Sequence, residues 1–129
     1  MKILGISLGR KNGTNDSMCK EALMAAKEMG ADVEFILMFD LDIKHCTGCT
    51  ACTAAVFSGR GNKCVIKDDF EWLVDKMYDA DGIVFAVPIF EEGAPGIFHT
   101  IMDRFGPRMD KATCMIGEKA KEGSIDPRY

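Results

Sequence analysis

The sequence lacks the features of several protein classes. No apolar run approaches the roughly 18 residues that a membrane-spanning helix requires. The 20 acidic residues outnumber the 16 basic ones, so no excess of positive charge is available for nucleic acid or an anionic membrane surface. The N-terminus enters a strand-like segment directly and carries no signal-peptide pattern. We therefore expect a cytoplasmic protein that binds neither nucleic acid nor membrane.

The composition is that of an ordinary globular protein. Hydrophobic residues make up 47% and charged residues 28% of the 129 residues, which argues against intrinsic disorder. A chain of this length forms one domain by default, and its core would bury about two-thirds of the unfolded surface. We find no internal repeat and no domain boundary. The sequence therefore predicts a single domain over residues 1–129.

Apolar runs and amphipathic segments alternate along the chain. Buried strands are predicted for residues 2–7, 33–39 and 83–87, and helices for about 16–29, 68–80 and 94–105. Asn15 or Asp16 is a candidate N-cap for the first helix, and Gly30 would end it. Residues 111–121 show a weaker helical pattern. Because consecutive strands are separated by helices, we expect a doubly wound α/β fold with parallel strands.

Two loops are predicted at one edge of this sheet, where the carboxyl ends of parallel strands meet. The first loop, residues 7–15, contains Gly9 and Gly13, which let its backbone bend. It also offers short polar side chains, two cations and a helix N-terminus, whose amides favour an anion. Because it follows neither the P-loop pattern nor GxGxxG, a phosphomonoester is favoured over a triphosphate or a pyrophosphate. The alternative is an ordinary polar connection between a strand and a helix.

The second loop, residues 88–93, follows the third strand. Pro88 stiffens this loop, and Phe90 offers an aromatic face to a flat heterocycle. The alternative is that Ile89 and Phe90 only cover the end of the sheet. A phosphate loop and an aromatic loop on one edge would together bind a phosphorylated ring system.

Four cysteines form the spacing C-x2-C-x2-C-x11-C within a segment, residues 40–67, that has no clean periodicity. They are Cys46, Cys49, Cys52 and Cys64. Without an export signal such thiols are expected to stay reduced and to bind metal or take part in redox chemistry. Three closely spaced thiolates and a distant fourth suit a [4Fe–4S] cluster. Zinc held by four cysteines and unmetallated thiols are the alternatives, and Cys19 is expected to lie in the core.

In the order of these motifs the sequence resembles the NAD(P)H-dependent FMN reductase family of the flavodoxin-like superfamily, and within it the iron–sulfur flavoproteins. The resemblance covers residues 1–110. The segments that carry it are KILGIS with loop residues 10–15, the cysteines ending in CVIKDD at 64–69, ADGIVF at 80–85, Pro88 and Met102-Asp103-Arg104. It implies a flavodoxin-like three-layer α/β/α fold with strand order 2-1-3.

The resemblance also implies cofactors, partners and site residues. FMN would be held non-covalently, with its phosphate at Ser7, Arg10, Asn12, Thr14 and Asn15 and its ring system beside Pro88, Ile89, Phe90, Glu91 and Gly93. A [4Fe–4S] cluster would take Cys46, Cys49, Cys52 and Cys64 as ligands. NAD(P)H or a ferredoxin-like protein would donate electrons, small molecules or proteins would accept them, and the chain would form a dimer or tetramer. We assign no catalytic acid, base or nucleophile.

The sequence departs from the family pattern in three places. The phosphate loop is one residue shorter than usual and its Asn-Thr order is reversed at Thr14-Asn15. Glu91 and Glu92 replace small and aromatic residues, and the gap before Cys64 is longer than is typical of the family. The family's later strands are not recognisable after residue 105, so we expect a fragment of a longer polypeptide.

Two other functions are compatible with the same residues. One is a non-catalytic flavodoxin-like module whose four cysteines hold structural zinc. The other is a one-electron carrier of the flavodoxin type that has no activity with pyridine nucleotides.

Overall fold

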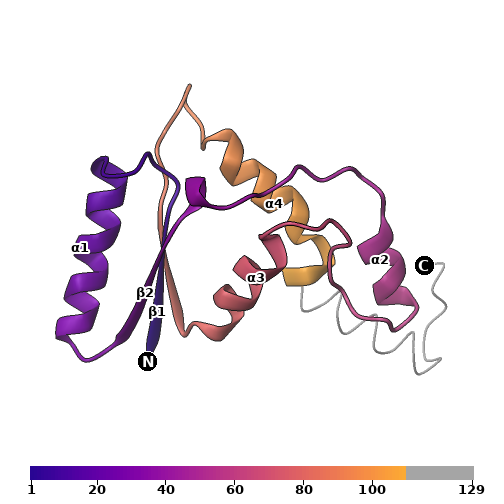
Figure 1. Ribbon diagram of the computed structural model, residues 1–129, viewed down its shortest axis with the longest axis horizontal. Coiled ribbons are helices and arrows are strands. Elements are labelled where there is room, and N and C mark those ends of the chain that lie inside the picture. Colours follow the sequence, from indigo (N-terminus) through magenta and orange to yellow (C-terminus); the bar gives the residue numbers. More distant parts are fainter. Residues whose placement is uncertain (110–129) are drawn as a thin grey trace. The chain divides into compact units, whose positions relative to one another are not determined.

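The computed structural model describes residues 1–109. Its elements, labelled in Figure 1, are β1 (Lys2–Ser7), α1 (Thr14–Glu28), β2 (Asp32–Leu37), the 3-10 helix η1 (Met38–Asp40), α2 (Ala51–Phe57), α3 (Phe70–Asp79), β3 (Gly82–Ala86) and α4 (Gly96–Met109). The chain divides into two compact units. The first contains Met1–Ile43 and Asp68–His99, and the second contains, of the described residues, Lys44–Lys67 and 100–109. The single-domain expectation stays a prediction, and the helix expected at 111–121 lies outside the described residues.

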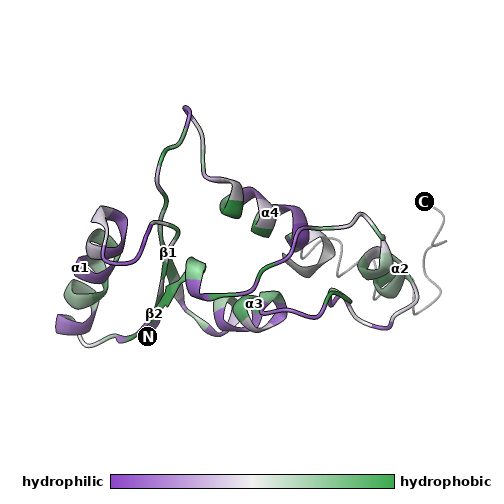
Figure 2. Cartoon of the chain, turned by 45° about the horizontal axis from the view of Figure 1, so that its top comes forward, coloured by the Kyte–Doolittle hydropathy of each residue, from purple (hydrophilic) through white to green (hydrophobic). Residues whose placement is uncertain are grey.

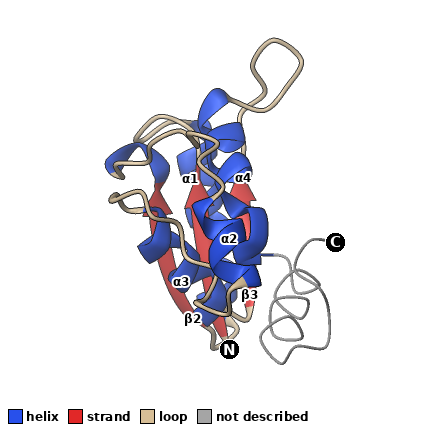
Figure 3. Ribbon diagram, turned by 90° about the vertical axis from the view of Figure 1, so that its right-hand side faces the viewer, coloured by secondary structure: helices blue, strands red, loops and turns tan. Residues whose placement is uncertain are grey.

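The first unit contains the whole described sheet. Its three strands are parallel and lie in the order β2-β1-β3, as Figure 3 shows in red. Helix α1 covers one face of this sheet and α3 the other (Figure 1). The predicted α/β fold and strand order are therefore confirmed. β2 and β3 are the edge strands among the described residues.

The core of the first unit lies around the central strand β1. Leu4 and Ile6 are completely buried, and Figure 2 shows the strands coloured as hydrophobic. Gly5 is required where α1 crosses the sheet, because a Cβ there would lie 2.6 Å from Leu23 Cδ1 and 2.9 Å from Cys19 Sγ. Cys19 is buried as predicted, and this burial raises the pKa of its thiol.

Helix α3 presents an apolar face to the sheet. The buried residues of this face are Phe70, Leu73, Val74 and Met77, at the spacing of one helical stripe. Its N-terminus is tied to the segment after η1 by two hydrogen bonds. The Asp42 N–H donates to Asp69 Oδ2 at 2.8 Å, and the Asp69 N–H donates to the Asp42 carbonyl at 2.9 Å. The helix predicted at 68–80 is therefore confirmed to within two residues at its start.

Other boundaries differ from the sequence prediction. Helix α1 begins at Thr14 with Gly13 as its N-cap, and neither Asn15 nor Asp16 caps it. The second strand ends at Leu37, and η1 follows it. Helix α2 was not predicted, because its seven residues are too few to show a helical repeat and only Val56 is buried. No described helix has the length and apolar character needed to span a bilayer.

Helix α1 buries few of its apolar side chains. Cys19 and Leu23 are buried, whereas Met18 is 63% and Met29 90% exposed. These two methionines therefore do not belong to the core. The buried residues of α1 are Asp16, Cys19 and Leu23.

A network of ion pairs joins β1, β2 and α3 in the first unit. Lys2 Nζ lies 2.6 Å from Asp79 Oδ2 and 3.6 Å from Glu34 Oε2, and Lys76 Nζ lies 2.7 Å from Glu34 Oε1. The hydrogen bond from Lys76 is the main reason that the pKa of Glu34 falls below its usual 4.5. The hydrogen bond from Lys2 likewise lowers the pKa of Asp79 below 3.8.

These shifts predict a loss of stability in acid. Both carboxyl groups have a lower pKa in the folded chain, so their contribution is complete above the ordinary carboxyl values and is lost as the pH falls through the folded ones. We expect the free energy of unfolding, measured with urea, to decrease between pH 6 and pH 3. The decrease should be smaller in Lys76→Met, because this variant removes the main cause of the shift at Glu34. An identical acid profile in the variant and the parent protein would contradict the assignment.

Candidate functional site

Both predicted cofactor loops leave the sheet at the same edge. In the parallel pair β1–β3, Ser7 is aligned with Ala86, and the Leu8 N–H donates to the Ala86 carbonyl at 2.9 Å. Asn15 from the first loop and Val87 before the second line one pocket. The structure therefore brings the two segments together on one edge, as the parallel topology predicts. Whether these residues bind a cofactor stays a prediction.

The first loop closes tightly on itself. The Gly13 N–H donates to the Arg10 carbonyl at 3.0 Å, and Asn12 between them has a φ of 58°. A Cβ at Gly13 would lie 2.8 Å from Arg10 Cγ and 3.0 Å from the Arg10 carbonyl oxygen. A Cβ at Gly9 would lie 2.8 Å from Asn15 Cβ. Both glycines are therefore needed for close approach within a compact turn.

This turn leads directly into the N-terminus of α1. The backbone amides of the first helical turn, at Thr14, Asn15 and Asp16, have no acceptor within the helix, and no side chain caps it. Ser7 is completely buried, and its Oγ has no hydrogen-bond partner within the described residues. The helix dipole and its amides favour an anion here.

The role that the sequence predicted for Asp16 is wrong. This residue was a candidate cap, but its Oδ2 instead accepts hydrogen bonds from the Asn12 N–H and from Lys20 Nζ, each at 2.8 Å. The side chain is 1% exposed. The hydrogen bond from Lys20 is the largest cause of a lowered pKa at Asp16, so the carboxyl group is ionised at neutral pH.

The second loop ends in a tight two-residue turn. Phe90 and Gly93 exchange backbone hydrogen bonds of 2.8 and 2.9 Å, and Glu91 and Glu92 between them have φ values of 45° and 66°. This is the pattern of a type I′ turn, which strongly favours asparagine and glycine at the two central positions. Ile89 is 74% and Phe90 57% exposed, so these two side chains do not simply cover the end of the sheet.

The positive φ values predict strain that substitution can relieve. Left-handed conformations cost on the order of 1 kcal/mol for each residue that is not glycine or asparagine. We expect the double variant Glu91→Asn, Glu92→Gly to raise the free energy of unfolding by about 1 kcal/mol, as measured by denaturant titration. Glu91→Gln with Glu92→Gln removes the same charges and keeps the strain. Equal stabilisation in both double variants would show that charge, and not backbone strain, is the cause.

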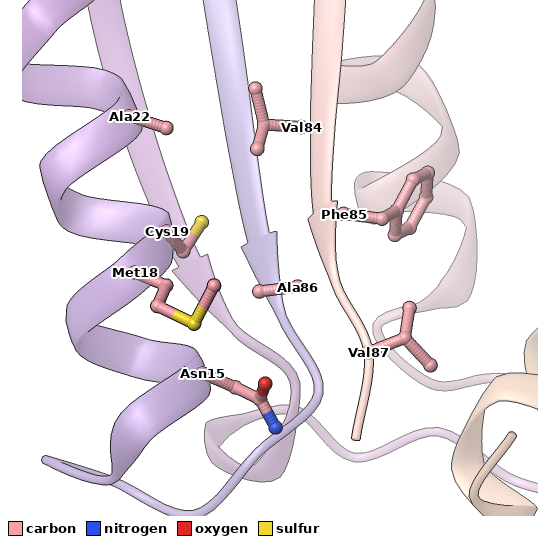
Figure 4. A pocket seen from close by; sticks show the side chains of 8 residues that line it. All are labelled: Asn15, Met18, Cys19, Ala22, Val84, Phe85, Ala86 and Val87. Atoms are coloured by element: carbon pink, nitrogen blue, oxygen red, sulfur yellow. The ribbon is translucent and has the colours of Figure 1, made fainter. Parts of the chain in front are cut away.

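A pocket of about 360 Å³ lies between α1 and β3 in the first unit (Figure 4). Its lining residues are Asn15, Met18, Cys19, Ala22, Val84, Phe85, Ala86 and Val87. Val84 and Ala86 point toward α1, whereas Phe85 and Val87 point the other way (Figure 4). The sequence analysis did not predict this pocket, since it assigned Asn15 to the phosphate loop, Cys19 to the core and residues 83–87 to a buried strand.

The cysteine segment belongs to the second unit. Cys46 and Cys49 are exposed, and Cys52 and Cys64 are half-buried. Cys46 Sγ accepts a hydrogen bond from the Gly48 N–H at 3.4 Å. The Ala51 N–H is the main cause of a lowered pKa at Cys49. Within residues 1–109 no three histidine, cysteine, aspartate or glutamate side chains are grouped so that they could hold a metal ion, so the predicted ligands are not brought together.

Helix α4 fixes the start of this cysteine segment. Arg104 Nη1 donates to the Lys44 carbonyl at 3.0 Å, and Thr100 Oγ1 lies 3.0 Å from His45 Nδ1. Arg104 and Thr100 are both buried. Lys44 Nζ in turn donates to the Lys67 carbonyl at 3.0 Å, so the two ends of the segment are joined. The contacts of Arg104 and Thr100 join residues 60 and 55 positions apart in the sequence, and no local pattern predicts them.

Comparison with known proteins identifies the family of this chain. Residues 1–121 match the family of NADPH-dependent FMN reductases. The chain belongs to this family. An iron–sulfur flavoprotein from Methanocaldococcus jannaschii is 35% identical over 108 residues, which are 83% of this chain and 53% of the relative. An iron–sulfur flavoprotein from Methanosarcina thermophila is 33% identical over 105 residues, covering 81% of this chain and 52% of the relative.

Solved structures with the same fold include a flavone reductase. It superimposes with a TM-score of 0.75 at 55% sequence identity, covering 99% of this chain and 39% of the flavone reductase. RosB shares the fold at a TM-score of 0.62 and 18% identity, over 85% of this chain and 44% of RosB. This member of the FMN reductase family thus spans about half the length of the curated relatives it matches.

Proposed function

We propose that this chain supplies the FMN site of an FMN-dependent oxidoreductase. The observation that carries the proposal is the compact first loop, whose glycines leave no room for side chains and which delivers the first-turn amides of α1 to one edge of the sheet. Such a loop binds a phosphomonoester well. The phosphate would be held by Ser7, Arg10, Asn12, Thr14 and Asn15. The buried Oγ of Ser7 has no hydrogen-bond partner among the described residues, which leaves this hydroxyl available for a phosphate oxygen.

The second loop would hold the ring system of FMN. Its residues Pro88, Ile89, Phe90, Glu91 and Gly93 follow β3 on the edge that also carries the phosphate loop. The exposed side chains of Ile89 and Phe90 can cover a flat apolar surface, and the turn presents backbone groups beside them. These residues bind and orient the ring and exclude water from one face of it. FMN, when bound, supplies transfer of a hydride or of single electrons.

We infer the electron donor from the family and the acceptor from a similar solved structure. NADPH is the proposed donor because the family is named for that activity, and a ferredoxin-like protein is the alternative. The 55% identity to a flavone reductase supports a small aromatic molecule as an acceptor. We propose a homodimer or homotetramer, and a location in the cytoplasm.

Binding of FMN and riboflavin tests the phosphate site. The two flavins differ only in the phosphate, so quenching of flavin fluorescence during titration measures what the first loop contributes. We expect FMN to bind at least about tenfold more tightly than riboflavin. Equal affinities would overturn the phosphate assignment. Oxidation of NADPH by the FMN-loaded protein then tests the reductase, and flavin binding without any such oxidation would indicate a flavodoxin-type electron carrier.

A metal centre at the cysteine segment is a second proposed function. It is supported by the four thiols within a segment whose ends are joined through Lys44 and Lys67, and by two relatives that are named iron–sulfur flavoproteins. Because the described thiols are not grouped as metal ligands, we derive no electron transfer step through a cluster.

Metal and sulfide analysis after anaerobic purification tests this second proposal. Iron and acid-labile sulfide in equal amounts, both lost in Cys49→Ser, would support a [4Fe–4S] cluster. Zinc without sulfide would indicate a structural site of four cysteines instead. Absence of both metals would refute the metal centre and leave the FMN proposal untouched.

A further inference from the structure

We infer that Asp16 is a positioning residue for the phosphate loop and that Lys20 neutralises its charge so that an anion can bind beside it. The inference rests on the proposed FMN site. It concerns two side chains that were not assigned to that site from the sequence or from the family resemblance. Both belong to α1, one helical turn apart, so they lie on the same side of the helix.

The conformation of the loop depends on Asp16. Asn12 has a left-handed φ of 58°, and its N–H donates to Asp16 Oδ2 at 2.8 Å. The next residue, Gly13, immediately precedes the first-turn amides that would contact the phosphate. Holding the Asn12 N–H therefore fixes the peptide planes that lead into those amides. Without this acceptor the left-handed residue loses the contact that stabilises its conformation.

The buried charge of Asp16 also disfavours the binding of a phosphate beside it. Its carboxylate is buried at the end of the helix where a phosphate would bind, and its Oδ1 has no hydrogen-bond partner among the described residues. A negative charge at this position repels an incoming phosphate. Lys20 offsets this repulsion, because its Nζ lies 2.8 Å from Asp16 Oδ2.

Lys20 is itself held in place by a second contact. Its Nζ lies 4.8 Å from the centre of the Phe35 ring on β2, within the range of a cation–π interaction. The ammonium group is therefore fixed between an aromatic ring and the buried carboxylate. This arrangement keeps a positive charge next to Asp16 although the Lys20 side chain is 47% exposed.

The charge of Lys20 can be tested against the phosphate of the ligand. In Lys20→Met we expect FMN to bind about tenfold more weakly, with riboflavin binding unchanged, because only the phosphate meets the uncompensated carboxylate. Adding Asp16→Asn to Lys20→Met should restore most of the affinity for FMN, since it removes the repelling charge. Lys27→Met makes the same charge change at the other end of α1 and should have little effect.

The positioning role is tested by two substitutions of Asp16. Asp16→Asn keeps an oxygen that can accept from the Asn12 N–H, so FMN affinity should stay within about threefold of the parent protein. Asp16→Ala removes the acceptor and should weaken FMN binding about tenfold without changing riboflavin binding. Equal losses for both flavins would show a general structural role and would overturn the inference.

The outcomes separate this inference from the proposed function. If the parent protein binds FMN and riboflavin equally, the phosphate site itself is wrong. If the parent protein prefers FMN but Lys20→Met keeps that preference, only the role of Asp16 and Lys20 is overturned. Should Asp16→Ala fail to fold, Lys20→Met and its double variant with Asp16→Asn still decide the question.

Discussion

Replacing Gly13 by valine should weaken FMN binding by more than about a hundredfold and change riboflavin binding little. The reason is the space around Gly13, where a Cβ would lie 2.8 Å from Arg10 Cγ and 3.0 Å from the Arg10 carbonyl oxygen. A backbone oxygen cannot move aside as the end of a side chain can. The turn from Arg10 to Gly13 would therefore open, and the amides of the first turn of α1 would no longer point to a common position.

A graded series makes this prediction specific. Gly13→Ala adds only the Cβ and should have an intermediate affinity for FMN. Gly96→Ala is the matched control, because no atom lies within 4 Å of a Cβ built at Gly96. Fluorescence titration gives the affinities, and circular dichroism shows whether each variant is folded. A folded Gly13→Val protein that binds FMN normally would mean that the loop does not hold the phosphate.

Replacing Phe70 by alanine should lower the free energy of unfolding by about 3–5 kcal/mol. Phe70 is completely buried at the first position of α3, where the apolar face of this helix meets the sheet. Removal of its ring loses the transfer energy and leaves a cavity that the rigid sheet cannot fill. Since a domain is stable by only about 5–15 kcal/mol, we expect a substantial fraction of the variant to be unfolded.

The measurement for Phe70 is denaturant unfolding followed by circular dichroism. Phe70→Leu should cost less than half as much and provides a variant that stays folded. Trp72→Ala is the control on the same helix, because Trp72 is 45% exposed and should contribute only about 1 kcal/mol through its contact with Lys76. Similar losses for Phe70→Ala and Trp72→Ala would contradict the assignment of the core.

The sheet was predictable from sequence because its signals are local. The apolar run KILGIS at residues 2–7 marks a strand that is central in the structure, and the alternation of strands and helices fixes parallel pairing. Parallel pairing in turn predicts that the loops after β1 and β3 share an edge. These steps use the identity and order of residues and need no knowledge of side-chain contacts.

The features that were missed depend on contacts that no local pattern encodes. Asp16 is a common capping residue, and only the folded loop shows that it accepts from Asn12 instead. The contact between Arg104 and Lys44 joins residues that are remote in sequence. Met18 fits an apolar stripe, but its exposure depends on how much of α1 the three described strands can cover.

The two edge strands of the sheet, as far as residues 1–109 form it, differ in a way that matters for assembly. β2 carries the acidic residues Asp32 and Glu34, whereas β3, with the sequence GIVFA, has no charged residue at all. Charged side chains on an edge strand discourage pairing with another backbone, and their absence leaves a strand receptive to it. Addition of a further strand is therefore favoured next to β3 and disfavoured next to β2. The difference in charge between these two edge strands gives the sheet a preferred direction of extension.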